Sequence, residues 1–123
     1  MAKHDAAKDL RTRGGVKITV DDQSGQESFT VETPAGQKFV LRDGPNEIAI
    51  SDTNGNTVTL DAGGITVTSA AKVTITASLV EVNASAVNVN ASHTKFAGTI
   101  QCDTMISNSV VSASYTPGAG NVW

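Results

Sequence analysis

Apolar side chains recur in pairs, two positions apart, through the middle of the chain. The stretch AKVTITASLVEVNASAVNVNASHTKFAG (71–98) divides into four units of seven residues. The third and fifth places of these units hold Val73 and Ile75, Val80 and Val82, Val87 and Val89, then Thr94 and Phe96. Residues two apart share one face of a β-strand, whereas a coiled coil needs apolar spacings of three and four. The pattern therefore predicts short strands.

The same apolar pairs occur upstream with looser spacing, at 48 and 50, 58 and 60, and 65 and 67. Turn-forming sequences separate them: DGPN (43–46), TNGN (53–56) and AGG (62–64). Further along, the turns shrink to Ala-Ser steps at 77–78, 84–85 and 91–92. Short strands at a nearly fixed period, each followed by a corner, are typical of a β-solenoid or β-helix.

Strand-like alternation also precedes this region, in VKITVDD (16–22), ESFTVET (27–33) and KFVLRD (38–43). After it, Ile100 and Cys102 keep step with Phe96, and then the register becomes ambiguous. The charged opening is expected to be a short helix or a disordered lead. The predicted parts are a lead (1–15), a strand collar (16–47), a shaft (48–98) and a tip region (99–123).

A three-sided coil needs about 20 or more residues per turn, so a seven-residue unit supplies only one side. Either one chain uses three units per coil, or three chains supply one side each. The second arrangement leaves no free strand edges and is favoured. We therefore expect an all-β fold, an intertwined homotrimeric triple-stranded β-helix. Its expected core is Ile48, Ile50, Val58, Leu60, Ile65, Val67, Val73, Ile75, Val80, Val82, Val87, Val89, Phe96, Ile100 and Cys102.

Composition narrows the classes of function. The chain of 123 residues has a formal net charge of −3, which gives no electrostatic reason to bind nucleic acid or an anionic membrane. Its start lacks the apolar run of a secretory signal. No stretch approaches the length of about 20 apolar residues that a transmembrane helix needs. The single cysteine allows no intrachain disulfide. We expect the protein to be made and assembled in a bacterial cytoplasm.

The stretch from Gly36 to Val67 resembles the β-helical part of central spike proteins of contractile injection machines. The residues that carry the likeness are Gly then K-x-V-L, I-x-I-x-D-x-x-Gly-Asn-x-V-x-Leu-Asp, and the following Gly-Ile-x-Val. These spikes include the phage baseplate assembly protein V family and the valine-glycine-repeat proteins of type VI secretion. The ending YTPGAGNVW is also similar to baseplate V-type chains. The resemblance implies a virion tail baseplate or injection particle.

Two departures from the family pattern bear on partners. Many spikes carry a hub domain, and some a lysozyme domain, before the needle, and this chain has room for neither. If the sequence is complete, the resemblance implies a needle that docks on a separate hub protein. The docking candidates are Lys3, Lys8, Arg11 and Arg13, with a solvated tail as the alternative for this lead.

The second departure concerns the tip. Some phage spikes hold an iron through a His-x-His motif, whereas here His4 and His93 stand far apart. Tip closure would come from packing or a capping protein. The candidate tip contacts are Tyr115, Pro117, Val122 and Trp123.

The sequence shows no motif for catalysis or for cofactor binding. The sequence contains no nucleophile elbow, P-loop, dinucleotide fingerprint or metal-ligand cluster, so we expect neither an enzyme nor a cofactor. Thr94 takes an expected inward place, where three copies could hold an ion on the axis, although a hydrated polar layer is favoured. Outward Thr rows such as 66 and 68 are typical of ice-binding solenoids, but the rows lapse after Thr76.

The function expected from these features is mechanical: a spike driven through the target's outer envelope, which it contacts transiently. Two alternatives remain. A trimeric stalk of a receptor-binding fibre or adhesin would share the trimer but needs an adhesive head. A monomeric β-solenoid acting on polysaccharide would need a carboxylate cluster on one face.

Overall fold

The structure, a computed structural model, describes residues 7–114. Over this range it contains seven five-residue β-strands and no helix. The strands are β1 (Ala7–Arg11), β2 (Lys17–Asp21), β3 (Ser28–Glu32), β4 (Lys38–Arg42), β5 (Glu47–Ser51), β6 (Thr57–Asp61) and β7 (Gly64–Thr68). The chain divides into two units, Met1–Val80 and Glu81–Trp123, and every one of these strands belongs to the first.

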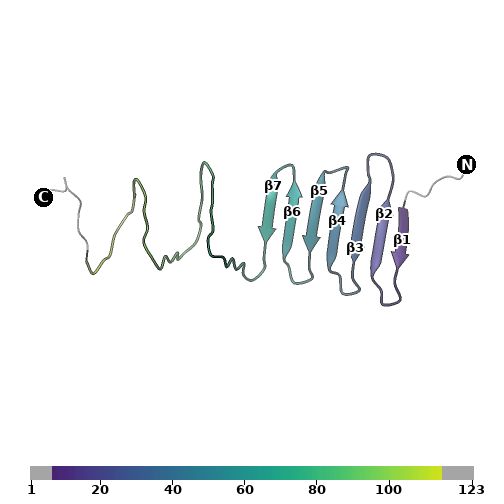
Figure 1. The fold of residues 1–123 in the computed structure, drawn as a ribbon, viewed down its shortest axis with the longest axis horizontal. Helices are drawn as coiled ribbons and strands as arrows, with labels where there is room; N and C mark the ends of the chain where they lie inside the picture. The colour runs from purple at the N-terminus through teal and green to yellow at the C-terminus, as the bar shows by residue number, and fades with distance from the viewer. Residues whose placement is uncertain (1–6, 115–123) are drawn as a thin grey trace, which may run out of the picture. The chain divides into compact units, whose positions relative to one another are not determined.

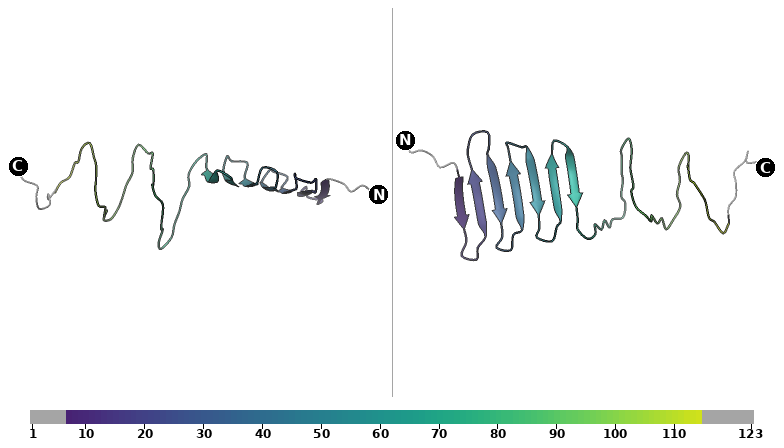
Figure 2. Two further views of the ribbon diagram at one scale, coloured as in Figure 1. Left: turned by 90° about the horizontal axis from the view of Figure 1, so that it is seen from above. Right: turned by 180° about the vertical axis from the view of Figure 1, so that it is seen from behind.

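The strands form one antiparallel sheet in sequence order, each paired with the next strand along the chain (Figure 1). Seen edge-on in Figure 2, the sheet is a single layer. The strands predicted within 16–22, 27–33 and 38–43 are present as β2, β3 and β4. The all-β class is confirmed.

One type of turn joins β1 to β2, β3 to β4 and β5 to β6. Each begins with Thr or Asp, whose side-chain oxygen accepts the backbone N–H four residues on: Val16 to Thr12 (3.0 Å), Gln37 to Thr33 (3.1 Å) and Asn56 to Asp52 (2.9 Å). The fourth residue is a glycine with positive φ, for example 104° at Gly36. A Cβ on Gly36 would lie 2.9 Å from Thr53 Cγ2. The sequence pattern [Thr/Asp]-x-x-Gly-x therefore encodes one edge of the sheet.

Two expectations need correction in this unit. The opening residues were expected to form a helix or a disordered lead, but β1 pairs with β2 from Ala7↔Asp21 to Arg11↔Lys17. The apolar pairs of residues 48–67 were expected in successive coils of an intertwined helix. They lie instead on β5, β6 and β7, paired antiparallel within one chain. The reason is that the turns at 52–56 and 62–63 reverse the chain, so the sheet ends only at Thr68.

Beyond β7 the described chain, residues 69–114, contains no strand. The backbone bends at Ser78, Ser85 and Ser92, the places where the Ala-Ser steps predict corners. Between these bends the apolar pairs lie on non-helical backbone without a strand partner in the same chain. Within a single chain the backbone of this region therefore makes no strand ladder.

The spacing of the bends changes near Gly98. From there they fall at Gly98, Asp103, Asn108 and Ala113, five residues apart. A hydrogen bond repeats at the same interval, because Ser107 Oγ donates to Ser109 O (2.7 Å) and Ser112 Oγ to Ser114 O (2.8 Å). This period accounts for the ambiguous register after Cys102: the seven-residue unit gives way to units of five, GTIQC, DTMIS and NSVVS (98–112).

Candidate functional site

One face of the sheet is almost wholly apolar. Strand register places directly paired residues on the same face, as in Phe39↔Ile50↔Val58↔Val67. Followed through all strands, this face carries Leu10, Ile18, Val20, Phe29, Val31, Phe39, Leu41, Ile48, Ile50, Val58, Leu60, Ile65 and Val67. The opposite face is mostly Thr, Ser and charged residues. We refer to the thirteen-residue surface as the apolar face.

The apolar face is not covered within the single chain. Among the described residues the only buried apolar side chain is Val40, 4% exposed, and it lies on the opposite face between Thr30 and Ala49. Ile65, in contrast, is 72% exposed. Monomeric proteins rarely expose a continuous apolar surface of this extent. The sheet therefore lacks a partner for the face that its sequence makes hydrophobic.

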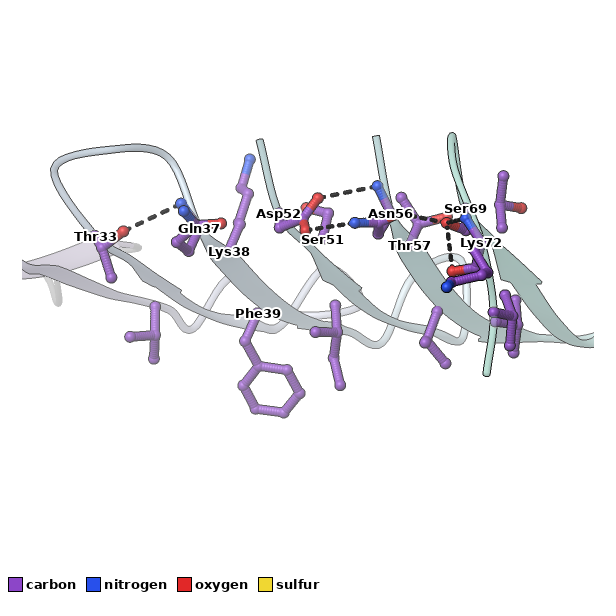
Figure 3. A pocket seen from close by; sticks show the side chains of 16 residues that line it. Thr33, Gln37, Lys38, Phe39, Ser51, Asp52, Asn56, Thr57, Ser69 and Lys72 are labelled. Atoms are coloured by element: carbon purple, nitrogen blue, oxygen red, sulfur yellow. Dashed lines mark hydrogen bonds between the residues drawn. The ribbon is translucent and has the colours of Figure 1, made fainter. Parts of the chain in front are cut away.

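A shallow groove of about 610 Å³ runs along the turn edge of this face. Its apolar lining comes from the five strands β3–β7 and from the segment that follows β7: Val31, Phe39, Ile50, Val58, Val67 and Val73. Figure 3 shows Phe39 on one side of the sheet and Lys38 on the other. Polar turn residues form the rim of the groove, where Gln37 Oε1 accepts the backbone N–H of Thr53 (3.2 Å) and links two adjacent turns.

Asp52 organises the last of these turns. Its carboxylate accepts the side-chain amide of Asn56 (2.8 Å) and the backbone N–H groups of Asn56 and Asn54 (both 2.9 Å). These donors, with the Asn56 side chain first, lower the pKa of Asp52 from 3.8 to about 2. Because donors within the turn already hydrogen-bond this carboxylate, we assign Asp52 a structural role.

The lowered pKa predicts how the turn responds to acid. A group with a depressed folded pKa contributes its stability above its ordinary value, 3.8, and loses it as the pH falls through about 2. The difference in melting temperature between wild type and Asp52→Ala should therefore narrow between pH 5 and pH 2. Asp22→Ala, at an exposed carboxylate in another turn, is the control. A difference for Asp52→Ala that does not depend on pH would contradict the prediction.

Ser69 is the first residue after β7, where the chain leaves the sheet. Its hydroxyl donates to Asn56 Oδ1 (2.7 Å) and accepts the backbone N–H groups of Ala71 (3.2 Å) and Lys72 (3.1 Å), as Figure 3 shows in part. Asn56, which also donates to Asp52, therefore joins the last turn to the first residues beyond β7. This small network fixes the point at which antiparallel pairing ends and the seven-residue units begin.

The predicted core residues fall into two groups. Those from Ile48 to Val67 lie together on the apolar face. The rest, from Val73 to Cys102, belong to the strandless segment and are exposed in the single chain. Sequence reasoning missed the seven apolar-face residues of β1–β4, Leu10, Ile18, Val20, Phe29, Val31, Phe39 and Leu41. Alternation in 16–43 was the available signal, but only the pairing register shows that these residues share a face with Ile48.

The docking candidates do not form one patch. Lys8 and Arg11 lie on opposite faces of β1, because they are three positions apart. Lys8 pairs with Val20 and so lies at the end of the apolar face, and Arg13 lies in the following turn. Lys3, His4 and the tip candidates Tyr115, Pro117, Val122 and Trp123 lie outside the described residues. His93 and Thr94 are exposed. Within residues 7–114 no three His, Cys, Asp or Glu side chains gather as a metal site, and no helix could cross a membrane.

Comparison with known families decides what this exposed face belongs to. Residues 28–90 match the phage baseplate V C-terminal trimerisation domain. The chain belongs to this family. The match covers just over half of the chain and runs from β3 through the second seven-residue unit into the third. No curated protein matches the chain significantly.

Membership of the baseplate V family bears on the assembly of the chain. A trimerisation domain supports a homotrimer. The family is one of structural baseplate proteins, so the chain is a component of a phage baseplate. The resemblance noted in the sequence is therefore confirmed at the level of the family.

Proposed function

We propose that three copies of this chain form the central needle of a contractile phage tail or a related injection particle. Sheath contraction would drive the needle through the outer envelope of the target cell. The observation that carries the proposal is the continuous apolar face, which consists of thirteen side chains and is uncovered in one chain. A membrane-piercing shaft needs stiffness, and a dry shared core supplies it.

In the proposed trimer the two parts of the chain are built differently. Three sheets turn their apolar faces toward a common axis and form the sides of a prism up to Thr68. Beyond Ser69 the three chains wind around each other, and each seven-residue unit supplies one side of a triple-stranded β-helix. The backbone between the bends at Ser78, Ser85 and Ser92, which has no strand partner in its own chain, supports this change, because winding would let neighbouring chains supply its ladder hydrogen bonds.

The proposed partners lie at the two ends. A hub protein would bind near β1, where Arg11 lies on the face opposite the apolar face and Arg13 lies in the following turn. A capping protein or the chain's own last residues would close the tip. The alternative function is the stalk of a receptor-binding fibre. Such a stalk would also be a trimer, but it would occupy a different place in the particle from a central needle. Tagging the chain and locating the tag by electron microscopy separates a central baseplate position from a fibre.

Molar mass tests the proposal directly. Light scattering on the purified chain should give a mass three times 12.6 kDa, and the species should resist detergent until it is boiled. A single-chain mass with cooperative unfolding would overturn the needle. A trimeric mass with the tag on a fibre would overturn only the place in the particle.

Cys102 provides an internal probe of the proposed winding. It is exposed in the single chain, but it shares the inward side with Ile100, two residues earlier. In the trimer Cys102 should react with a maleimide much more slowly than in the denatured chain. A Gln101→Cys, Cys102→Ser variant, which moves the thiol one place to the outward side, should react rapidly. Equal rates at the two positions would contradict the inward register.

A further inference from the structure

The charged side chains of the sheet are divided unequally between its two turn edges. One edge is formed by the turns that begin at Thr12, Thr33 and Asp52, and the other by the turns that begin at Asp22, Asp43 and Ala62 (Figure 1). Counted with the strand residues that flank each turn, the first edge carries four basic and two acidic side chains. The second carries one basic and six acidic side chains. We call them the basic edge and the acidic edge.

The imbalance is greatest at the two turns on either side of β2. The basic turn, residues 11–17, contains Arg11, Arg13 and Lys17 and no acidic residue. The acidic turn, residues 21–27, contains Asp21, Asp22 and Glu27 and no basic residue. The two turns lie at opposite ends of β2, about 13 Å apart, which exceeds the Debye length of about 8 Å at physiological ionic strength. Within one chain their charges therefore interact only weakly.

Neither turn forms an ion pair within the single chain. Among residues 7–114 the one ion pair joins Arg42 Nη1 to Glu47 Oε1 (2.6 Å). Arg11 and Lys17 are direct partners in the strand register, and like charges placed opposite each other destabilise a sheet. The basic turn therefore gathers positive charge with no carboxylate to balance it, and the acidic turn is its counterpart of opposite sign.

We propose that the basic turn of each copy packs against the acidic turn of the next copy in the proposed trimer. A three-fold rotation keeps the order of the two edges around the axis. Three sheets with their apolar faces inward therefore meet at corners that each join a basic edge to an acidic edge. Such a contact between two different surfaces closes into a ring. This inference rests on the proposed needle and names the residues that join its copies.

The two turns also lie at nearly the same height along the sheet. Both adjoin β2, so they differ in height by one strand spacing, about 4.8 Å. The long side chains of Arg11 and Lys17 can span this offset to reach the carboxylates of Asp21 and Glu27 on the next copy. Each of the three corners then brings three cationic side chains to three carboxylates.

The charged edges give the assembly a direction that the apolar face does not specify. A copy turned end over end could still place its apolar face toward the axis. Its basic edge would then meet the basic edge of a neighbour, and like charges across an interface oppose such an arrangement. The charges therefore favour three chains that run the same way, as their winding beyond Ser69 requires.

Charge reversal at either turn tests this contact. The basic-turn variant is Arg11→Glu/Lys17→Glu. The acidic-turn variant is Asp21→Lys/Glu27→Lys. Either variant leaves the two turns with net charges of the same sign, so at low salt it should fail to trimerise or unfold at a clearly lower urea concentration than the wild type. The deficit should shrink as NaCl is raised to about 0.5 M, because salt screens the repulsion between exposed charges.

A combined variant with all four substitutions separates contact between copies from damage to a turn. Asp21 Oδ1 also accepts the backbone N–H of Gln23 (3.0 Å), so the acidic-turn variant loses a hydrogen bond as well as a charge. The combined variant restores opposite signs at each corner, and it should unfold at a higher urea concentration than either two-residue variant. Independent damage at the two turns would instead make it the least stable of the three.

The control is Glu81→Lys/Asp103→Lys, which makes the same change in charge as the acidic-turn variant but outside the sheet. It should show no deficit, and a deficit equal to that of the acidic-turn variant would assign the effect to net charge and overturn the inference. The mass of each sample separates the inference from the proposed function. A single-chain mass for the wild type would overturn both.

Two results with a wild-type trimer would overturn the inference alone. The first is a combined variant that is the least stable of the three. The second is an unchanged urea midpoint in both two-residue variants, which would leave the basic turn free for another partner such as the hub.

Discussion

Ile65→Asp should leave the purified chain unable to trimerise. Ile65 is 72% exposed in the single chain, a degree of exposure at which a substitution ordinarily has little effect. In the proposed trimer, however, the apolar face becomes core, and an unpaired carboxylate there would cost about 3 kcal/mol or more per chain. The cost recurs in all three chains. Light scattering should show single chains or aggregates in place of the trimeric mass.

Thr66→Asp is the control for this substitution. Thr66 is the next residue of β7, is also exposed, and points to the opposite face of the sheet. The variant adds the same charge to the same strand and should remain a trimer with nearly unchanged thermal stability. Equal loss of trimer in both variants would indicate damage to β7 itself and would contradict the assignment of faces.

Deleting seven residues, 79–85, the length of one unit, should shorten the shaft without preventing trimer formation. The deletion joins Ser78 to Ala86, so the next unit keeps its corner and its apolar pair, Val87 and Val89, in register. The trimer should form and resist detergent, and its melting temperature should fall only modestly, because one layer of core is lost. Scanning calorimetry and unheated gel lanes measure both properties.

Deleting six residues, 79–84, removes nearly the same mass but breaks the register. Two corner serines, Ser78 and Ser85, then stand side by side, so the following unit must either bulge or turn Asn88 inward in place of Val87. An amide buried without a partner costs about 1–3 kcal/mol, here in each of three chains. The six-residue variant should melt well below the seven-residue variant. Equal stabilities would contradict a wound, register-dependent shaft.

The sequence predicts strands well because two kinds of information agree locally. Apolar alternation in VKITVDD and KFVLRD marks β2 and β4, and the Ala-Ser steps mark corners at Ser78 and Ser85. Both signals depend only on neighbouring residues. The seven-residue unit, too short for a whole coil, already favoured three chains, and the family match supports the homotrimer.

The pairing of the strands was harder to predict. The apolar pairs at 58 and 60 and at 80 and 82 have the same spacing, yet the first lies in an antiparallel sheet and the second does not. What separates them is the connection. A glycine with φ of 91° at Gly55 reverses the chain before β6, whereas an Ala-Ser step only turns a corner. Charged β1 was missed because its partner strand, more than its composition, determines its structure.

The order of the sheet has a consequence for how the particle is made. Every strand pairs only with the strands before and after it in the sequence, so the contacts within the sheet are local and should form quickly. The apolar face, however, gains its stability only when other copies arrive. Refolding of the denatured protein should therefore slow markedly on dilution, because encounter between chains, and not ordering within one, limits the rate. In the cell, a high local concentration of newly made chains would speed assembly of the proposed trimer.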